Sequence, residues 1–214
     1  MATSFYGNIQ EAELKNKVAA DWFATYDSTP VIGNIDFAVA VPTHGPQLFE
    51  TEYLLWAEAK KGTSYDILES FIQLILTIGK ARTYEDKLPP AFLGAFDAEK
   101  IAFVPYHEVM DVFSQNDFNW NVTPSDHQSK EFQQLLGLLS GLKKQLVLFR
   151  YATDEKELRQ FIKRNFRMGQ DERMLPKMVR MVVSASLPET SGSRSCTSAS
   201  TNSSVLYGTK GLMM

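Results

Sequence analysis

A carboxylate and an ammonium group stand two residues apart at Glu58 and Lys60, at the end of a strand predicted over residues 52–60. Alternate side chains of a strand share a face, so both groups point to one side. The strand is otherwise largely apolar, and a buried strand does not normally end with two ionisable groups on one side unless something there needs them. A solvated strand end with a surface ion pair worth ~0–1 kcal/mol is the alternative explanation.

Asp36 is a second acid in an apolar run, predicted as a strand over residues 35–41. Asp is a poor strand former and is costly to bury without a partner. It could simply be hydrogen-bonded near the turn predicted at Gly33-Asn34. If the two strands are neighbours, however, Asp36 and Glu58 at one end form a site of hard oxygen ligands. Such a site suits Mg²⁺, which binds through one or two carboxylates and keeps several waters.

The residues Ile35-Asp36 and Glu58-Ala59-Lys60 together resemble the signature of the PD-(D/E)xK nuclease superfamily, an Asp on one strand followed by Glu-x-Lys on the next. Ile35 replaces the Pro of that name, which carries no chemistry. The resemblance extends over about residues 8–105, and residues 54–106 look like the N-terminal nuclease part of bacterial restriction-modification proteins that fuse cleavage with DNA methylation. It implies a restriction-endonuclease-like fold and Mg²⁺-dependent hydrolysis of double-stranded DNA.

The same resemblance implies roles for individual residues. Asp36 and Glu58 would hold Mg²⁺ together with the carbonyl of Ala59, and Glu11 would contribute directly or through water. Lys60 would orient or help deprotonate the attacking water and offset charge on the phosphate. Two rivals stay open: a repair or junction-resolving nuclease of the same fold, and a catalytically silent DNA-binding or assembly module.

The family also has an acid on its first helix, and two residues could supply it. Glu11 continues the inward face formed by Leu14 and Val18, whereas Glu13 falls beside Lys17 on the polar side. Glu11 is therefore the candidate, with Glu13 in reserve. Both acids could instead be present only because the helix macrodipole favours acids in a first turn.

Gln73 is a further candidate, because it interrupts an apolar helix after the Glu-x-Lys strand and similar nucleases place a Gln there to support the site. It could equally be a buried polar group bonded to backbone. No zinc site is expected, because the histidines have no ligand spacing, and no glycine-rich phosphate loop is present. A basic run could follow a DNA backbone or be a solvated face. The histidines are His44, His107 and His127, and the run is Lys156, Arg159, Lys163, Arg164, Arg167, Arg173, Lys177 and Arg180.

The elements that must position these residues follow from periodicity and turn signals. Helices are predicted over residues 8–26, 65–80, 126–149 and 154–166, with a short helix and a loop over 107–123. Two hairpins are predicted, one turning at Gly33-Asn34 and one joining residues 91–96 to 100–105. The pattern predicts an α/β fold with a central mixed sheet flanked by helices, and a helical C-terminal extension.

Composition and length allow one domain with a hydrophobic core. The chain has 214 residues, 44% of them hydrophobic, and a net charge of -3, which argues against simple coating of nucleic acid. We expect a nuclease core over residues 1–106, a helical extension or connector to a methyltransferase or other domain over 107–183, and a disordered Ser/Thr/Gly-rich tail over 184–214. One cysteine, Cys196, no secretory signal and no membrane segment indicate a cytoplasmic protein.

Overall fold

The computed structural model describes residues 6–42, 51–115, 117–141 and 145–166, all of which belong to one compact unit. The strands are β1 (Phe37–Ala40), β2 (Tyr53–Ala59), β3 (Phe92–Phe96), β4 (Lys100–Pro105) and β5 (Val147–Arg150). The helices are α1 (Glu11–Trp22), α2 (Ile67–Ala81), α3 (Thr83–Asp86), α4 (Lys130–Leu139) and α5 (Glu155–Asn165), with 3₁₀ turns η1 (Tyr106–Glu108) and η2 (Met110–Ser114). No helix in these ranges is long and apolar enough to cross a membrane.

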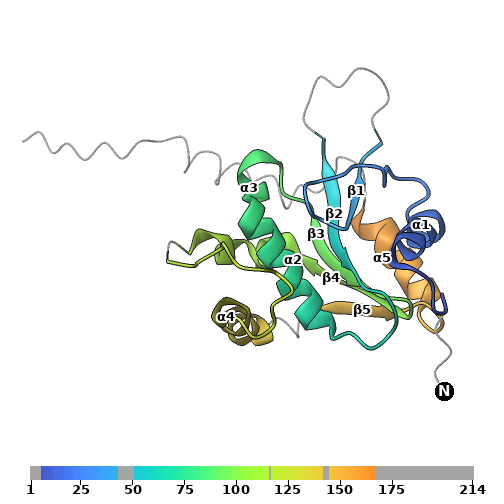
Figure 1. Cartoon of the computed structure of the whole chain (residues 1–214). Coiled ribbons are helices and arrows are strands. Elements are labelled where there is room, and N and C mark those ends of the chain that lie inside the picture. Colours follow the sequence, from blue (N-terminus) through green and yellow to red (C-terminus); the bar gives the residue numbers. More distant parts are fainter. Residues whose placement is uncertain (1–5, 43–50, 116, 142–144, 167–214) are drawn as a thin grey trace, which may run out of the picture. The chain divides into compact units, whose positions relative to one another are not determined.

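The strands form one mixed sheet in the order β1-β2-β3-β4-β5 (Figure 1). β2 and β3 are parallel, because α2 carries the chain back across the sheet between them, and the other neighbours are antiparallel. The predicted α/β class with a central mixed sheet is therefore confirmed, as is the antiparallel pairing of residues 92–96 with 100–105.

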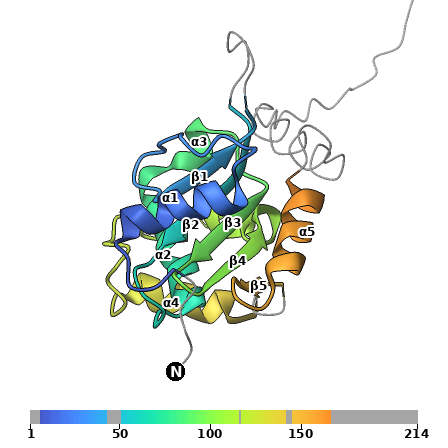
Figure 2. The same ribbon diagram turned by 90° about the vertical axis from the view of Figure 1, so that its right-hand side faces the viewer.

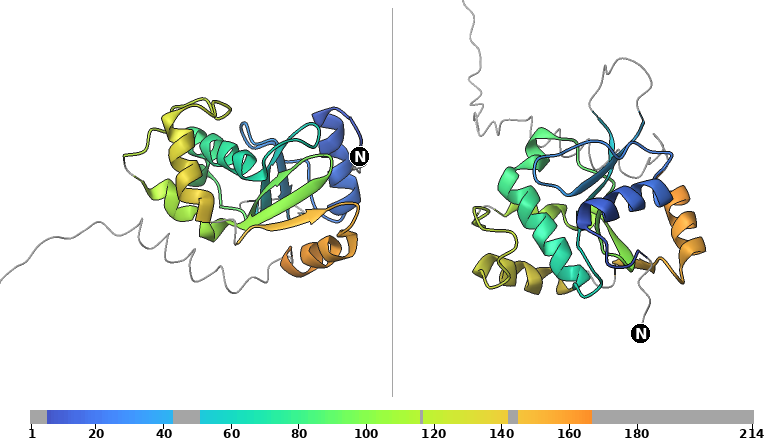
Figure 3. Two further views of the ribbon diagram at one scale, coloured as in Figure 1. Left: turned by 90° about the horizontal axis from the view of Figure 1, so that it is seen from below. Right: turned by 45° about the vertical axis from the view of Figure 1, so that its right-hand side comes forward.

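Helices cover both faces of the sheet, and each face has its own apolar core. α2 and α4 lie on one face with the 3₁₀ turns, while α1 and α5 lie on the other (Figures 1 and 2). The view from below in Figure 3 shows the sheet between these two layers. All seven residues of β2 are buried, because alternate side chains enter opposite cores: Trp56 faces α2, and Ala57 faces the layer of α1 and α5.

Helix α2 begins where the sequence places a good N-cap. The Asp66 carboxylate accepts hydrogen bonds from the backbone N–H groups of Leu68, at 2.7 Å, and Glu69, at 3.2 Å. The helix is apolar on more than one side because it packs on β2 and β3 and also against α4. The predicted helix over residues 65–80 is thus confirmed to within two residues at its start.

The hairpin predicted around Gly33-Asn34 has the expected turn, but the strands predicted on either side of it do not pair with each other. Gly33 has a φ of +51°, as the turn requires, but only a single bridge joins Ile32 to Ile35, and Val31 is 88% exposed. Residues 37–40 pair instead with β2, which offers the apolar run a longer and fully buried partner. Asp36 consequently lies just before β1.

The long helix predicted over residues 126–149 is also wrong. α4 begins later, capped by the Ser129 hydroxyl, which accepts from Phe132 N at 3.2 Å, and it ends at Leu139. Residues 147–150 form β5 and pair with β4, which shields one edge of the sheet. The boundary predicted at residue 106 therefore falls between two paired strands, while the tail predicted from residue 184 lies outside the described residues. The predicted final helix is confirmed as α5.

Candidate active site at the edge of the sheet

Asp36 and Glu58 meet where β1 starts and β2 ends. Phe37 pairs with Ala57 in the antiparallel register, so the residues next in line, Asp36 and Glu58, face each other. The Asp36 Oδ2 atom accepts a hydrogen bond from the backbone N–H of Ala59 at 3.2 Å. This bond holds the Asp36 carboxylate against the end of β2.

Glu58 and Lys60 lie on one side of the chain, as the alternation of a strand requires. The Lys60 Nζ atom is 2.6 Å from Glu58 Oε1, and Glu58 is only 3% exposed. Although β2 ends at Ala59, the Lys60 backbone N–H still donates to Phe96 O at 2.9 Å. That hydrogen bond continues the pairing with β3 and fixes the direction in which Lys60 leaves the sheet.

Burial and neighbouring charge make the Glu58 carboxyl unusual. Loss of hydration first, and then the negative charges of Asp36 and Glu11, raise its pKa to about 7, although Lys60 acts in the opposite direction. A buried acid next to other acids is costly to ionise, and a cation bound between them would lower that cost.

Asp97 is a second buried acid, just after β3 at the same end of the central strands, and it has a structural role. Asp97 is 1% exposed and its Oδ2 atom lies 3.1 Å from Lys100 Nζ. It also accepts the backbone N–H groups of Glu99, at 2.8 Å, and Lys100, at 3.0 Å, and so holds the turn between β3 and β4. Within the described residues Glu58 accepts only from Lys60, so no turn or cap explains its burial.

Helix α1 brings Glu11 to the same cluster through a lysine that the sequence reasoning missed. The Lys15 Nζ atom lies 3.2 Å from Glu11 Oε1 and 3.8 Å from Asp36 Oδ1. Glu13 pairs instead with Lys17 at 3.3 Å on the exposed side of the helix. The only sequence signal for Lys15 was its spacing from Glu11, which is that of an ordinary surface ion pair on a helix.

Gln73 lies on α2 and is partly buried. Its backbone carbonyl accepts from the Thr77 hydroxyl at 2.9 Å, but in the described part of the chain its side chain makes no hydrogen bond to Asp36, Glu58 or Lys60. The structure thus brings Asp36, Glu58 and Lys60 together, whereas none of the hydrogen bonds among the described residues joins Gln73 to them.

The donor set suits a hard cation with few protein ligands. Over the described residues, no group of three or more His, Cys, Asp or Glu side chains is arranged to hold a metal ion. Two carboxylates do meet, Asp36 and the buried Glu58, beside the backbone of Ala59. Because Mg²⁺ is commonly held by one or two carboxylates and keeps several waters, these residues fit that ion.

The histidines and the basic run lie elsewhere. His107 pairs with Glu108 at 3.1 Å and His127 with Glu69 at 3.3 Å, while His44 lies outside the described residues. Of the basic run, Lys156, Arg159, Lys163 and Arg164 are described, all on α5 and exposed, and Arg167, Arg173, Lys177 and Arg180 are not.

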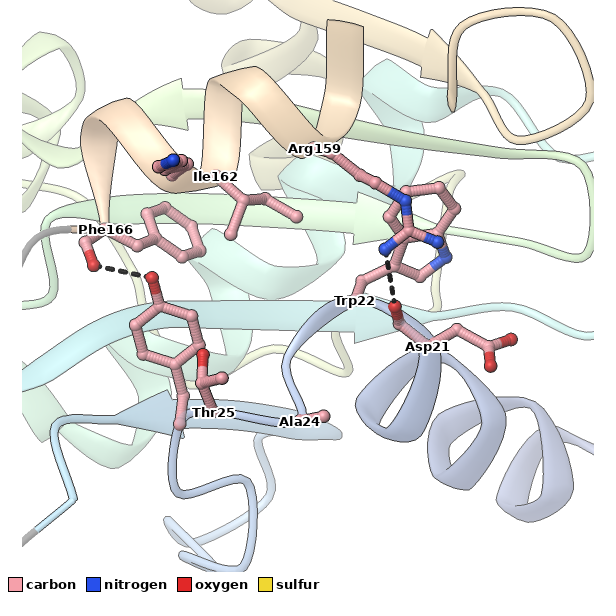
Figure 4. Close-up of a pocket in the computed structure, with 9 residues that line it drawn as sticks. Asp21, Trp22, Ala24, Thr25, Arg159, Ile162 and Phe166 are labelled. Carbon is pink, nitrogen blue, oxygen red and sulfur yellow. Dashed lines mark hydrogen bonds between the residues drawn. The ribbon is translucent and has the colours of Figure 1, made fainter. Parts of the chain in front are cut away.

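Arg159 is exposed but contacts the end of α1. Its guanidinium lies 4.6 Å from the Trp22 ring centre and donates to Asp21 O at 3.2 Å, beside a cavity of about 500 Å³ (Figure 4). None of the residues that line this cavity belongs to the carboxylate cluster. Arg159 therefore fastens α5 to the end of α1, whereas Lys156, Lys163 and Arg164 have no ion pair within the described residues.

Comparison of the chain with family models, with curated proteins and with solved structures finds no match.

Proposed function

We propose that this chain is a magnesium-dependent endonuclease that hydrolyses phosphodiester bonds in double-stranded DNA, as the cleavage part of a restriction-modification enzyme. The observation that carries the proposal is the buried Glu58, which lies beside Asp36 and is bound by Lys60 at 2.6 Å. Unlike Asp97, this acid has no turn to hold, which favours a chemical role over a structural one.

In this proposal Asp36, Glu58 and the Ala59 carbonyl hold Mg²⁺, and Glu11 contributes directly or through water. The bound ion supplies a lowered pKa for the attacking water and polarises the phosphoryl oxygen. Lys60 orients that water or takes part in its deprotonation, and its positive charge offsets the charge that builds on the phosphate. The family resemblance assigns Gln73 a supporting role from α2, although its side chain makes no hydrogen bond to these residues among those described.

The wider assignment follows from the same motif. We assign the sheet, including β5 from the stretch predicted as an extension, to the restriction-endonuclease-like type, in a cytoplasmic protein that works with a methyltransferase or other domain. Lys156, Lys163 and Arg164 on α5, whose charges have no partner in the described ranges, are available to DNA phosphates. The intact trio of Asp36, Glu58 and Lys60 argues against a silent DNA-binding module.

The test compares Lys60→Ala with Lys100→Ala in a time course of plasmid cleavage in MgCl₂. Both lysine side chains are 16% exposed and both pair with a buried acid, so the two variants lose similar structural contacts. Lys60→Ala should cut at least 10²-fold more slowly, because it removes an interaction that matters mainly in the transition state. Lys100→Ala should keep wild-type cleavage.

Metal binding separates the two roles within the site. Calorimetric titration should show that Lys60→Ala still binds Mg²⁺. Asp36→Asn, which keeps an acceptor for Ala59 N but removes the charge, should lose both metal binding and cleavage. Normal cleavage by either variant, or no cleavage by the wild type with any duplex in MgCl₂, would reject the proposal.

A further inference from the structure

Lys15 is the one residue of the cluster that the proposed function leaves without a task. It stands on α1, one turn after Glu11, and its side chain is one quarter exposed. Its ammonium group reaches two acids on different elements, Glu11 on the same helix and Asp36 just before β1. An ordinary helix-surface pair, such as Glu13 with Lys17, has no such second partner.

We propose that Lys15 is a built-in counter-ion that competes with the divalent cation for Asp36 and Glu11, and so sets how tightly the site binds metal. This inference rests on the proposed function, because it assumes that these acids are metal ligands. Lys15 is a positioning residue in this scheme and takes no part in the chemical step.

The geometry around Asp36 supports the competition. The Oδ2 atom of Asp36 is held by Ala59 N at 3.2 Å, and the Oδ1 atom is the one near Lys15, at 3.8 Å. A cation that approached Oδ1 would therefore meet the Lys15 charge. The four-carbon side chain of lysine is flexible, and a partly exposed one can swing into water at little cost.

Charge balance explains why the competition matters. Even with Glu58 ionised, the three acids Glu11, Asp36 and Glu58 and the two lysines Lys15 and Lys60 leave at most one net negative charge in the cluster. A divalent cation gains little from one net charge, and more once the scissile phosphate adds another. Lys15 thus favours metal binding together with DNA over metal binding alone.

The experiment measures the affinity of the full chain for Mg²⁺ alone by calorimetric titration, without DNA. Lys15→Met keeps the length and apolar stem of the side chain but removes its charge. It should bind Mg²⁺ more tightly, by on the order of tenfold or more, because the positive charge that lies 3.8 Å from Asp36 Oδ1 is gone. Lys15→Arg should stay within about twofold of the wild type.

Lys17→Met is the matched control. Lys17 makes the same four-residue helix pair with Glu13, at 3.3 Å, but among the described residues the ion pair of Asp36 is with Lys15 and not with Lys17. Its affinity for Mg²⁺ should be that of the wild type. Thermal melting of each variant shows whether the fold is retained, and Lys15→Gln, which also removes the charge, replaces Lys15→Met if that variant does not fold.

The outcomes distinguish this inference from the proposed function. If the wild type cleaves DNA but Lys15→Met binds Mg²⁺ no more tightly than the wild type, the counter-ion role alone is overturned. Tighter binding by Lys15→Met with no cleavage of any duplex would support the counter-ion role and reject the nuclease. No binding of Mg²⁺ by the wild type or by Lys15→Met would overturn both.

Discussion

At the scale of single residues, the site is defined by an acid in a costly environment. Glu58 lies in a strand that is buried from end to end, next to Asp36 and with Lys60 as its hydrogen-bond partner. Isolated burial of a carboxylate is expensive, and one ion pair offsets only part of that cost. Proteins accept such a cost mainly where the group has a function, which is why Glu58 is the centre of the proposal.

The raised pKa of Glu58, about 7 against an ordinary value of 4.5, leads to a pH-dependent stability. Between these values the folded protein holds a proton that the unfolded chain has lost, so the free energy of unfolding falls as pH rises from about 5 to 8. The full effect is on the order of 3 kcal/mol. The glutamine side chain of Glu58→Gln cannot ionise, so the free energy of unfolding of this variant should not show that fall with pH.

Urea unfolding followed by tryptophan fluorescence at pH 5, 6, 7 and 8, without divalent cations, tests this expectation. Relative to the wild type, Glu58→Gln should gain stability steadily across the series. A constant difference between the two proteins at all four pH values would mean that Glu58 titrates normally.

At the scale of elements, α2 is the crossover helix that connects β2 to its parallel neighbour β3. Its last turns are held by an aromatic cluster in which Trp120 packs against Phe118, with ring centres 4.3 Å apart, and against Phe113, at 5.6 Å. Trp120 lies directly on Gly79, where an added Cβ would stand 1.9 Å from the indole ring. Only glycine allows this approach.

Two glycine-to-alanine changes in helices should therefore have opposite signs. Gly79→Ala should destabilise the fold by about 1–3 kcal/mol, because Trp120 must leave its place. Gly137→Ala in α4, where an added Cβ meets nothing within 4 Å, should stabilise it by about 0.5–1 kcal/mol through helix propensity. Chemical denaturation of both variants measures the difference, and equal effects would contradict the packing of Trp120.

At the scale of the whole described unit, its first and last helices, α1 and α5, build one core together. Leu14 and Val18 of α1 share an apolar cluster with Leu158 and Ile162 of α5, and with Phe149 of β5. Tyr26 donates from its hydroxyl to Phe166 O at 2.7 Å, a contact across 140 residues of sequence. The apolar core between the sheet and α1 therefore needs β5 and α5, which follow β4 in the sequence.

Truncation tests how the unit is divided. A fragment of residues 1–106 lacks β5, α4 and α5, so it should leave the edge of β4 and much of both cores exposed. We expect it to bind a hydrophobic dye and to unfold without a cooperative transition. A fragment of residues 1–183 should unfold at the midpoint of the full chain. Cooperative unfolding of the 1–106 fragment would instead support an independent core.

The sequence by itself determined the features that depend on neighbours along the chain. The helix periodicity predicted α1, α2 and α5, turn residues predicted the pairing of β3 with β4, and strand alternation put Glu58 and Lys60 on one side. Each of these follows from backbone geometry and local hydrophobic pattern, which are short-range properties.

Only the tertiary structure decided the features that depend on partners far away in sequence. Residues 147–150 looked helical among leucines but became β5, because the exposed edge of β4 offered backbone hydrogen bonds. Asp36 lies opposite Glu58 because β1 pairs with β2 and not with the segment before Gly33. Lys15 became part of the cluster only when α1 packed beside Asp36. Strand partners and the neighbours of a charge depend on contacts between residues far apart in sequence, and these contacts override local propensity.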